Sequence, residues 1–394
     1  MSFVNDAGKV LRENIRDYGM FIALFAIFVF FTIATNGLFI SPRNILNLVN
    51  QSGYIAVLAI GMTLVIVIRH IDLSVGFLAG FLGAVAAIAM VSWNLPVWVV
   101  IPFVLFLGIL AGRLTSFMVA DLGIPAFVAT LAGWLGYRGA LQLVTRSTGT
   151  IIISNNAFNA IGNGFIPDLP FAPIVPGIHN LTLTLGLFGI VLFVSGELIN
   201  RIRLQRQNIK VQSMEMFTIK LIVVSALIAG ITWILAGYRG LSWTAVVVLI
   251  VVFSYHFMTT RTVLGRHIYA VGGNPEAAEL SGIRVKRVTH VVFGSMGMLA
   301  ALAGMMFASR LQSATTTAGQ LFELDAIAAS FVGGVSAAGG VGTVVGSLIG
   351  ALVMTSLTNG MNLMGIDISY QYIVRAIVLA AAVIFDVTTR RNSQ

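Results

Sequence analysis

The sequence of 394 residues contains no cysteine, and only 9% of its residues are charged. Without cysteine the chain cannot form disulfides, iron–sulfur clusters or zinc sites with thiolate ligands. Soluble domains carry about 25% charged residues, so the low charge excludes an ordinary soluble protein. Because 58% of the residues are hydrophobic and the mean hydropathy is +0.96, we expect the chain to lie in a lipid bilayer.

Lysine is also scarce, with Lys9, Lys210, Lys220 and Lys286 as its four occurrences. None of them stands in the sequence G-x-x-x-x-G-K-[ST], so the phosphate-binding loop of ATPases is missing. The glycine cluster 339–346 lacks the spacing of a dinucleotide-binding loop and lies inside an apolar run, which indicates packing or a broken helix. The histidines show no metal-binding or catalytic spacing. We therefore expect no catalytic site, metal or cofactor in this chain.

Long apolar runs predict an all-α protein that crosses the membrane many times. A bilayer core about 30 Å thick needs roughly 20 apolar residues per helix. Runs without charged residues occur at 18–42, 44–68, 73–112, 122–137, 169–196, 240–260, 288–309 and 326–366. A polar turn at 92–96 divides the third run, and Gly339-Gly340 divides the last. The prediction is one transmembrane permease domain, 1–394, with ten to twelve passes that include broken or half helices.

Basic residues gather in four segments, which predict how the chain is oriented. These residues are Lys9, Arg12 and Arg16; Arg201, Arg203, Arg206 and Lys210; Arg261, Arg266, Arg284, Lys286 and Arg287; and Arg390 and Arg391. By the positive-inside rule the four segments are cytoplasmic. An even number of passes lies between successive segments, so we expect both termini inside, with 1–17 as a cytoplasmic N-terminal segment. Dispersal of the net charge of +9 among apolar spans argues against binding of nucleic acid.

The longest loop on the opposite side of the membrane runs from 146 to 180. It is rich in asparagine and proline, which are typical of loops. Two interpretations fit: a periplasmic surface that touches an external partner, or a solvated spacer.

Gly346 and Gly350 have the spacing G-x-x-x-G within the last apolar run. Small residues at this spacing let two helices approach closely. Packing inside the chain and a dimer face are both compatible with the pattern.

The cytoplasmic loop 259–288 contains a segment, 275–281, whose residues specify a short helix. Asn274 is a good N-cap, Pro275 suits the first helical position, and Glu276 favours the positive end of the helix dipole. Gly282 can end the helix in the left-handed conformation. A helix of about two turns is marginal alone in water. We expect it to dock on its own membrane domain or on a cytoplasmic partner.

Glu276-Ala277-Ala278 followed by Gly282 resembles the E-A-A-x-x-x-G coupling loop of ABC importer permeases. The chain as a whole resembles their sugar-permease family, which includes the ribose, xylose, arabinose and multiple-monosaccharide permeases. The likeness also rests on 41–48, 61–66, 71–76, 323–329 and 339–342. Segment 146–240 is longer than in the shorter family members and looks most like the xylose and multiple-monosaccharide permeases. The leucine-proline pair that usually follows the coupling glycine is absent.

The resemblance implies a homodimeric permease of the bacterial inner membrane that imports a monosaccharide of the xylose, glucose, galactose or arabinose class. It also implies two partners, an ABC ATPase subunit that hydrolyses ATP and a periplasmic sugar-binding protein that delivers the substrate. The ATPase-coupling residues would be Gly272, Asn274, Pro275, Glu276, Ala277, Ala278, Ser281 and Gly282. A nucleoside, polyol or autoinducer is the alternative substrate. An ion-coupled secondary transporter and a structural membrane subunit are the alternative functions.

Polar residues beside the apolar spans are candidates for the translocation pathway, because ionisable groups are expensive in a bilayer and usually functional. They are Asp72, Ser74, Gln51, Glu323, Asp325, Asn359 and Asn362. Asp72 could instead cap the helix that follows it or pair with Arg69 or His70. The two acidic residues near 324 could serve a helix dipole, and the asparagines could bond one helix to another.

Overall fold

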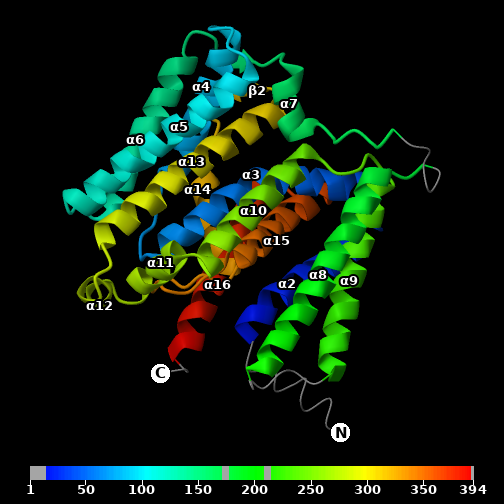
Figure 1. Cartoon of the computed structure of the whole chain (residues 1–394). Helices are drawn as coiled ribbons and strands as arrows, with labels where there is room; N and C mark the ends of the chain where they lie inside the picture. Colours follow the sequence, from blue (N-terminus) through cyan, green and yellow to red (C-terminus); the bar gives the residue numbers. More distant parts are fainter. Residues whose placement is uncertain (1–14, 171–176, 208–213, 392–394) are drawn as a thin grey trace.

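The computed structural model describes residues 15–170, 177–207 and 214–391, which are almost entirely helical (Figure 1). The helices are α2 (Ile15–Ala34), η1 (Leu38–Ile40), α3 (Pro42–Val67), α4 (Val75–Val91), α5 (Val97–Ser116), η2 (Phe117–Asp121), α6 (Ala126–Thr145), α7 (Asn156–Asn163), α8 (Asn180–Arg206), α9 (Met214–Ala236), α10 (Trp243–Arg261), α11 (Val263–Gly273), α12 (Pro275–Leu280), α13 (Val285–Leu311), α14 (Phe322–Val332), α15 (Val344–Leu363) and α16 (Ile368–Arg391). Strands β1 (Thr150–Ile152) and β2 (Ser313–Thr315) pair antiparallel. The predicted all-α class is confirmed.

Among the described residues, eight helices are long and apolar enough to cross a membrane. They are α3, α5 with η2, α8, α9, α10, α13, α15 and α16. Two shorter apolar helices cover Gly19–Ala34 and Val75–Val91. The chain is therefore a multi-pass membrane protein, and the count of ten to twelve passes stays a prediction.

The spanning helices α9 and α16 are missing from the charge-free runs, because Lys220 interrupts the apolar sequence of α9, and Arg375 and Asp386 interrupt that of α16. Lys220 of α9 donates a hydrogen bond to Glu197 of α8, with 2.7 Å between Nζ and Oε1. Arg375 of α16 pairs with Asp325 of α14, with 2.9 Å between Nη1 and Oδ1. A partner on a neighbouring helix makes a charge tolerable beside lipid, so a search that admits no charge overlooks both helices.

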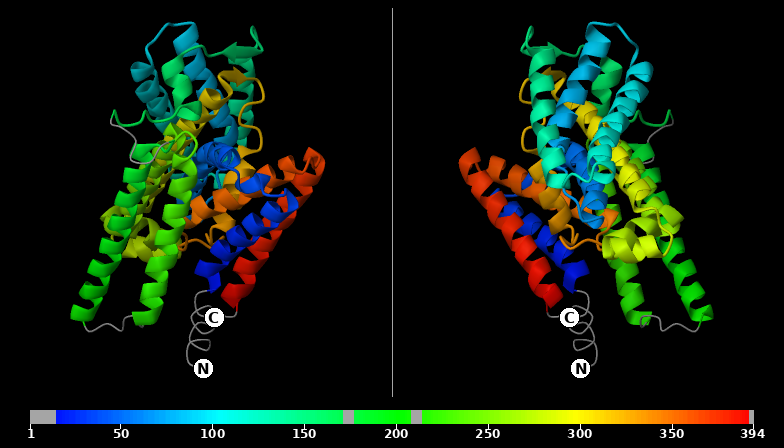
Figure 2. Two further views of the ribbon diagram at one scale, coloured as in Figure 1. Left: turned by 90° about the vertical axis from the view of Figure 1, so that its right-hand side faces the viewer. Right: turned by 90° about the vertical axis from the view of Figure 1, so that its left-hand side faces the viewer.

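The helices form a buried core with peripheral helices around it. The most apolar windows of α3, α13 and α15 are 83%, 72% and 67% buried, whereas those of α8 and α16 are 6% buried. Helix α3 packs against α10, α13, α14 and α15. Helices α8 and α9 pack mainly on each other and stand at the periphery (Figures 1 and 2). Helix α3 therefore contacts more of the other core helices than a peripheral helix does.

Glycine contacts set the closest approaches between core helices. A Cβ atom at Gly108 of α5 would overlap the carbonyl oxygen of Gly297 on α13. A Cβ atom at Gly350 of α15 would overlap the carbonyl oxygen of Ala329 on α14. Small residues at such positions let the backbones of two helices come into direct contact. The G-x-x-x-G pair therefore packs two helices of the same chain.

Both turns expected inside the longest apolar runs are present. Asn94 takes a left-handed φ of 52° between α4 and α5. Gly339 and Gly340 have φ values of 83° and 73° in the loop between α14 and α15. Glycine adopts such values without the steric cost that a Cβ atom brings, and each run thus yields two helices.

Much of the 146–180 loop is ordered and packed against the core. Asn155 accepts a hydrogen bond from the N–H of Phe158 and caps α7, and Phe158 is fully buried. Ser309 of α13 donates its hydroxyl to the carbonyl of Phe158 at 2.7 Å and accepts the N–H of Gly162 at 2.7 Å. The spacer interpretation is wrong for 150–163, while 171–176 lie outside the described residues.

The basic segments lie toward one end of the molecule. Figure 1 places α12, the C-terminal ends of α8 and α16, and the N-terminal ends of α2 and α9 toward the bottom. Helix α7 and strand β2 lie at the top. The arrangement fits the expectation that these segments share a membrane side, and residues 1–14 lie outside the described part of the chain. That the shared side is cytoplasmic stays a prediction.

Candidate functional site

Helix α12 has the two ends that its sequence specifies. The side chain of Asn274 accepts a hydrogen bond from the N–H of Ala277 at 3.1 Å, and Pro275 occupies the first position. At the other end, Gly282 has a φ of 84°. Its N–H donates to the carbonyl of Glu279, and the N–H of Ile283 donates to that of Ala278. This 6→1 and 5→2 pattern is the Schellman motif, which satisfies carbonyls at a helix end.

One side of α12 is docked and the other is free. Ala278 is buried against the membrane domain, where α12 packs on α11 and α13. Glu276, Ala277 and Glu279 are exposed, and the Leu280 side chain is 91% exposed. Leu280 lies outside the spans that lipid would cover. The helix therefore presents an apolar side chain to solvent next to two carboxylates.

The segment before α12 lies against the end of α3. A Cβ atom at Gly272 would overlap the carbonyl oxygen of Val67, and it would lie 2.6 Å from the backbone nitrogen of Gly340. Arg69 Nε donates to the carbonyl of Gly272 at 2.7 Å, and Arg69 Nη2 donates to the carbonyl of Gly273. Gly272 thus lies so close to the backbone of Val67 that only glycine fits there. Arg69 binds the carbonyls of Gly272 and Gly273 and does not pair with Asp72.

Three of the pathway candidates gather where α4, α6 and α14 meet. Asp72 accepts hydrogen bonds from the N–H of Ser74 at 2.9 Å and from its hydroxyl at 2.6 Å. Glu323 is 4% exposed, and its Oε1 accepts the indole N–H of Trp134 at 3.0 Å. Its Oε2 accepts no hydrogen bond within the described residues and lies against Gly76. Asp72 therefore forms a local turn with Ser74, the N-cap residue of α4, and does not cap the helix with its side chain. Glu323 is a buried carboxylate with one unsatisfied oxygen among the described residues.

The other acidic and amide candidates bond to neighbouring elements. Asp325 pairs with Arg375, as described above. Asn359 Oδ1 accepts a hydrogen bond from Asn44 Nδ2 at 2.9 Å, which joins α15 to α3. Asn362 Oδ1 accepts one from Gln371 Nε2 at 2.7 Å, beside the turn into α16. Gln51 lies half-buried on α3. The hydrogen-bonded candidates thus take part in several separate groups of contacts within the described structure.

A polar cavity, which we call the polar hollow, lies between the start of α3 and the end of α13, at the end of the molecule opposite α12. This polar hollow has a volume of about 940 Å³. Its polar lining includes five amides and three arginines: Asn44, Asn47, Asn50, Asn163, Gln312, Arg43, Arg239 and Arg310. Phe165 and Tyr238 add aromatic rings, and no carboxylate lines it among the described residues. Arg310 donates to Asn47 at 2.7 Å, whereas Asn50 Oδ1 accepts no hydrogen bond in the described part of the chain.

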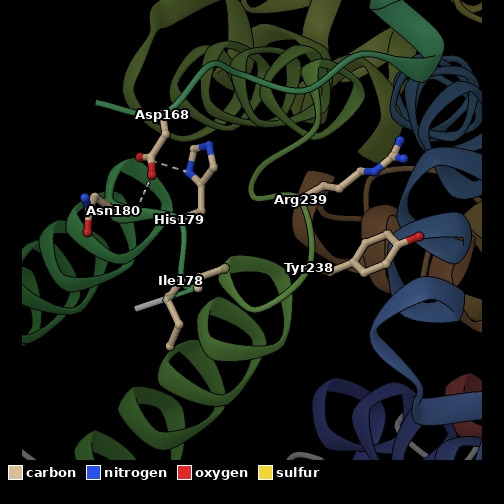
Figure 3. Close-up of a pocket in the computed structure, with 8 residues that line it drawn as sticks. Asp168, Ile178, His179, Asn180, Tyr238 and Arg239 are labelled. Atoms are coloured by element: carbon tan, nitrogen blue, oxygen red, sulfur yellow. Dashed lines mark hydrogen bonds and ion pairs between the residues drawn. The ribbon is translucent and has the colours of Figure 1, made fainter. Parts of the chain in front are cut away.

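A smaller neighbouring cavity has a volume of about 320 Å³. Its polar side chains cap the start of α8 and do not all point into the cavity. Figure 3 shows Asp168, His179 and Asn180 together, whereas Tyr238 and Arg239 point away from them. Desolvation acts to raise the pKa of Asp168, but hydrogen bonds from backbone N–H groups at the start of α8, with His179 nearby, make the net shift downward. Tyr238 and Arg239 also line the polar hollow.

Comparison with known proteins identifies the chain. Residues 44–383 match the family described as "branched-chain amino acid transport system / permease component". The chain belongs to this permease family. The match covers most of the helices that form the core of the permease, α3 and α13 to α15 included.

Curated relatives of the permease carry sugar-transport names. This chain is 38% identical over 382 residues to the xylose transport system permease protein XylH of Escherichia coli K12, and the alignment covers 96% of this chain and 94% of the relative. It is 36% identical over 351 residues to the ribose import permease protein RbsC of Haemophilus influenzae, covering 88% and 86%. Comparison with solved structures gave no match. The resemblance inferred from the sequence is confirmed, although the family description itself names amino acids.

Sequence reasoning missed two parts of the permease. The sequence suggests Arg69 only as a partner for Asp72, because its contacts with Gly272 and Gly273 cross more than 200 positions. Arg310 and Asn47 of the polar hollow are likewise separated by 263 positions. Local patterns carry no signal for such contacts, although the asparagines spaced by three at 44, 47 and 50 lie on one side of a helix.

Proposed function

We propose that the permease is the membrane subunit of an ATP-driven importer of a monosaccharide. In this proposal a separate ABC ATPase binds α12 and hydrolyses the ATP, and a periplasmic sugar-binding protein delivers the substrate. Two copies of the permease form the pore in the bacterial inner membrane, with both termini in the cytoplasm. ATP-driven closure of the ATPase moves α12 and rocks the helices between outward and inward openings, a rigid-body change between two states.

The single observation that carries this proposal is the exposed side of α12. A surface leucine alone needs no explanation, but Leu280 is 91% exposed on a helix of six residues whose caps hold it in place. A helix this short gains little stability by itself. A capped helix that presents one apolar anchor beside Glu276 and Glu279 is suited to bind a protein partner with a complementary groove.

Two observations favour a monosaccharide as the substrate. The relatives at 38% and 36% identity are named as xylose and ribose permeases. The polar hollow, of about 940 Å³, falls in the usual size range of ligand sites, about 300–1,000 Å³. Its amides can donate to and accept from hydroxyl groups. We propose a substrate of the xylose, glucose, galactose or arabinose class, with nucleosides, polyols and autoinducers as competitors in the assay.

The decisive experiment is reconstitution of the permease in liposomes with the ATPase encoded beside it and the matching binding protein. We expect the ATPase to co-purify, and sugar uptake to require both ATP and sugar-loaded binding protein. Radiolabelled xylose is the first substrate, and an excess of each competitor tests the class. Uptake that follows an ion gradient without any ATPase would instead support a secondary transporter and contradict the proposal.

Replacing Asn50 by leucine tests whether the polar hollow takes part in transport. Asn50 is 8% exposed and its Oδ1 is unsatisfied in the described structure. A buried polar group without a hydrogen-bond partner destabilises the folded state by about 1–3 kcal/mol. Because Asn50→Leu removes such a group, its thermal stability should be unchanged or higher. We expect sugar uptake to fall severalfold all the same.

Asn44→Leu is the comparison for thermal stability, because Asn44 lines the same hollow but its amide is hydrogen-bonded. Asn44 Nδ2 donates to the carbonyl of Phe39 at 2.8 Å and to Asn359 at 2.9 Å. Its loss should lower the thermal stability, because two hydrogen bonds disappear and their acceptors stay buried. Normal uptake by Asn50→Leu would show that the hollow plays no part in transport.

Gly272→Ala and Gly273→Ala form a matched pair. They test whether the contact of the coupling segment, residues 272–282, with the end of α3 is needed for transport. A Cβ atom at Gly272 would overlap the backbone of Val67, whereas a Cβ atom at Gly273 would meet nothing within 4 Å. Because backbone cannot yield as a side chain does, Gly272→Ala must shift the segment before α12. We expect ATP-dependent uptake to fall about tenfold or more, within the range of coupling free energies, and Gly273→Ala to transport normally. Equal uptake by the two variants would contradict the assignment.

A further inference from the structure

Helix α3 ends in a Schellman motif with an unusual residue at its left-handed position. The N–H of Arg69 donates to the carbonyl of Ile66 at 2.8 Å, and the N–H of His70 donates to that of Val65 at 3.0 Å. Arg69 has a φ of 67°. Glycine is the usual residue at this position, because a Cβ atom is strained there. Arginine therefore stands at 69 against the preference of the backbone, and such an outlier calls for a reason in the surroundings.

The surroundings supply that reason. Arg69 Nε and Nη2 donate to the carbonyls of Gly272 and Gly273, the last two residues of α11. These carbonyls are unsatisfied within the helix, and a guanidinium at a helix C-terminus is also favoured by the dipole. The planar fork of arginine can hold two neighbouring acceptors, which an ammonium group cannot do in the same way.

A third segment joins the same contact. The N–H of Gly340 donates to the carbonyl of Val67 at 2.8 Å, and the hydroxyl of Tyr269 on α11 donates to the carbonyl of Gly342 at 2.6 Å. The loop 333–343 leads directly into α15. The ends of α3 and α11 and the start of α15 thus meet around one arginine.

We propose that Arg69 is a positioning residue that makes the coupling segment and α3 move as one body. This inference rests on the proposed function. Helix α12 follows α11 after a single residue and packs on α11 and α13, and α11 in turn packs on α10, α13 and α3. Helix α3 packs against α10, α13, α14 and α15. Beside these packing contacts, the Arg69 hydrogen bonds tie the end of α11 directly to α3, so a displacement of α12 by the ATPase is passed to α3 through them.

The test compares Arg69→Gly, Arg69→Lys and Arg203→Ala in the reconstituted complex. Arg69→Gly relieves about 1–2 kcal/mol of left-handed strain and loses two hydrogen bonds whose carbonyl acceptors water can partly reach, so its thermal stability should stay close to that of the wild type. We expect it to bind the ATPase and retain basal ATP hydrolysis. Stimulation by sugar-loaded binding protein and sugar uptake should fall about tenfold or more, within the roughly 5–150-fold range of coupling effects.

Two further variants separate coupling from folding. Arg69→Lys should recover part of the uptake, because its three donors can reach one of the two carbonyls. Arg203 lies exposed near the end of α8, toward the same end of the molecule, and Arg203→Ala should behave as the wild type. Wild-type uptake by Arg69→Gly would overturn the inference, as would a loss of both thermal stability and ATPase binding. A wild-type complex that binds no ATPase would instead reject the proposed function, whatever Arg69 does.

Discussion

Leu280→Asp is expected to abolish binding of the ATPase and with it ATP-dependent uptake. Leu280 is 91% exposed at the end of α12, so it contributes little to the fold of the permease. Truncation of an apolar anchor in an interface costs about 2 kcal/mol or more, roughly a 30-fold loss of affinity. A carboxylate in the same groove would also remain unpaired, which adds to the loss. Binding of purified ATPase to the permease in detergent or nanodiscs measures the effect.

Leu280→Met is the control for this variant. Methionine has a similar volume and keeps an apolar surface, so the ATPase should bind within a few-fold of the wild type. Membrane insertion and thermal stability should be the same for both variants, since the side chain lies in solvent. Full ATPase binding by Leu280→Asp would show that α12 is not the docking helix.

Glu276→Arg and Gly282→Pro test the same helix in different ways. Glu276 is exposed in the first turn, so Glu276→Arg reverses a charge on the docking face and places a cation at the positive end of the dipole. Gly282 has a φ of 84° and donates its N–H to Glu279, and proline can do neither. Both variants should insert in the membrane yet fail to transport. Normal transport by either would remove the coupling role of α12.

The coupling helix could be predicted from sequence because every feature that defines it is local. Asn274, Pro275 and Gly282 lie within nine residues, and each fixes one backbone conformation or one hydrogen bond. The turn at Gly339-Gly340 is equally local. Apolar composition likewise fixes the membrane class, since no soluble core could hold so many apolar residues.

Contacts between distant segments could not be predicted in the same way. The left-handed Arg69 is a local feature without a sequence signal, because the residue usually found there is glycine. Lys220 and Arg375 interrupt two apolar runs, and only the positions of their partners explain why lipid tolerates them. The sequence likewise leaves undecided what the short helix α12 binds, since packing on the membrane domain and binding of a partner are both possible. The structure assigns the first to Ala278 and leaves Leu280 free.

These contacts also change how the pathway candidates are interpreted. Asn359 and Asp325 are each used to join helices of the core. The polar hollow, by contrast, is built from residues at helix ends and connections, with Asn50 unsatisfied at its edge. Side chains that hold helices together must keep their partners, whereas those that meet a passing solute must exchange theirs. On this physical distinction the hollow is the better candidate for contact with the substrate.

Arg375→Met is expected to be the most damaging change within the membrane domain. The side chains of Arg375 and Asp325 are 22% and 15% exposed, with 2.9 Å between Nη1 and Oδ1. Arg375 Nε also donates to Thr358 at 3.2 Å. Removal of one partner of a buried pair costs about 3–5 kcal/mol, because the remaining charge is left uncompensated. Thermal unfolding of the purified permease in detergent should therefore begin at a clearly lower temperature, and the yield of folded protein should fall.

The double variant Asp325→Asn with Arg375→Met separates a helix lock from a transport role. With both charges gone, the carboxylate is no longer unpaired, so most of the lost stability should return. If the pair only joins α14 to α16, sugar uptake should return together with the stability. Recovered stability without recovered uptake would contradict that role and show that the Asp325 carboxylate or the Arg375 guanidinium is needed during transport. Asp325→Asn alone leaves a buried guanidinium without its counter-charge and should be nearly as unstable as Arg375→Met.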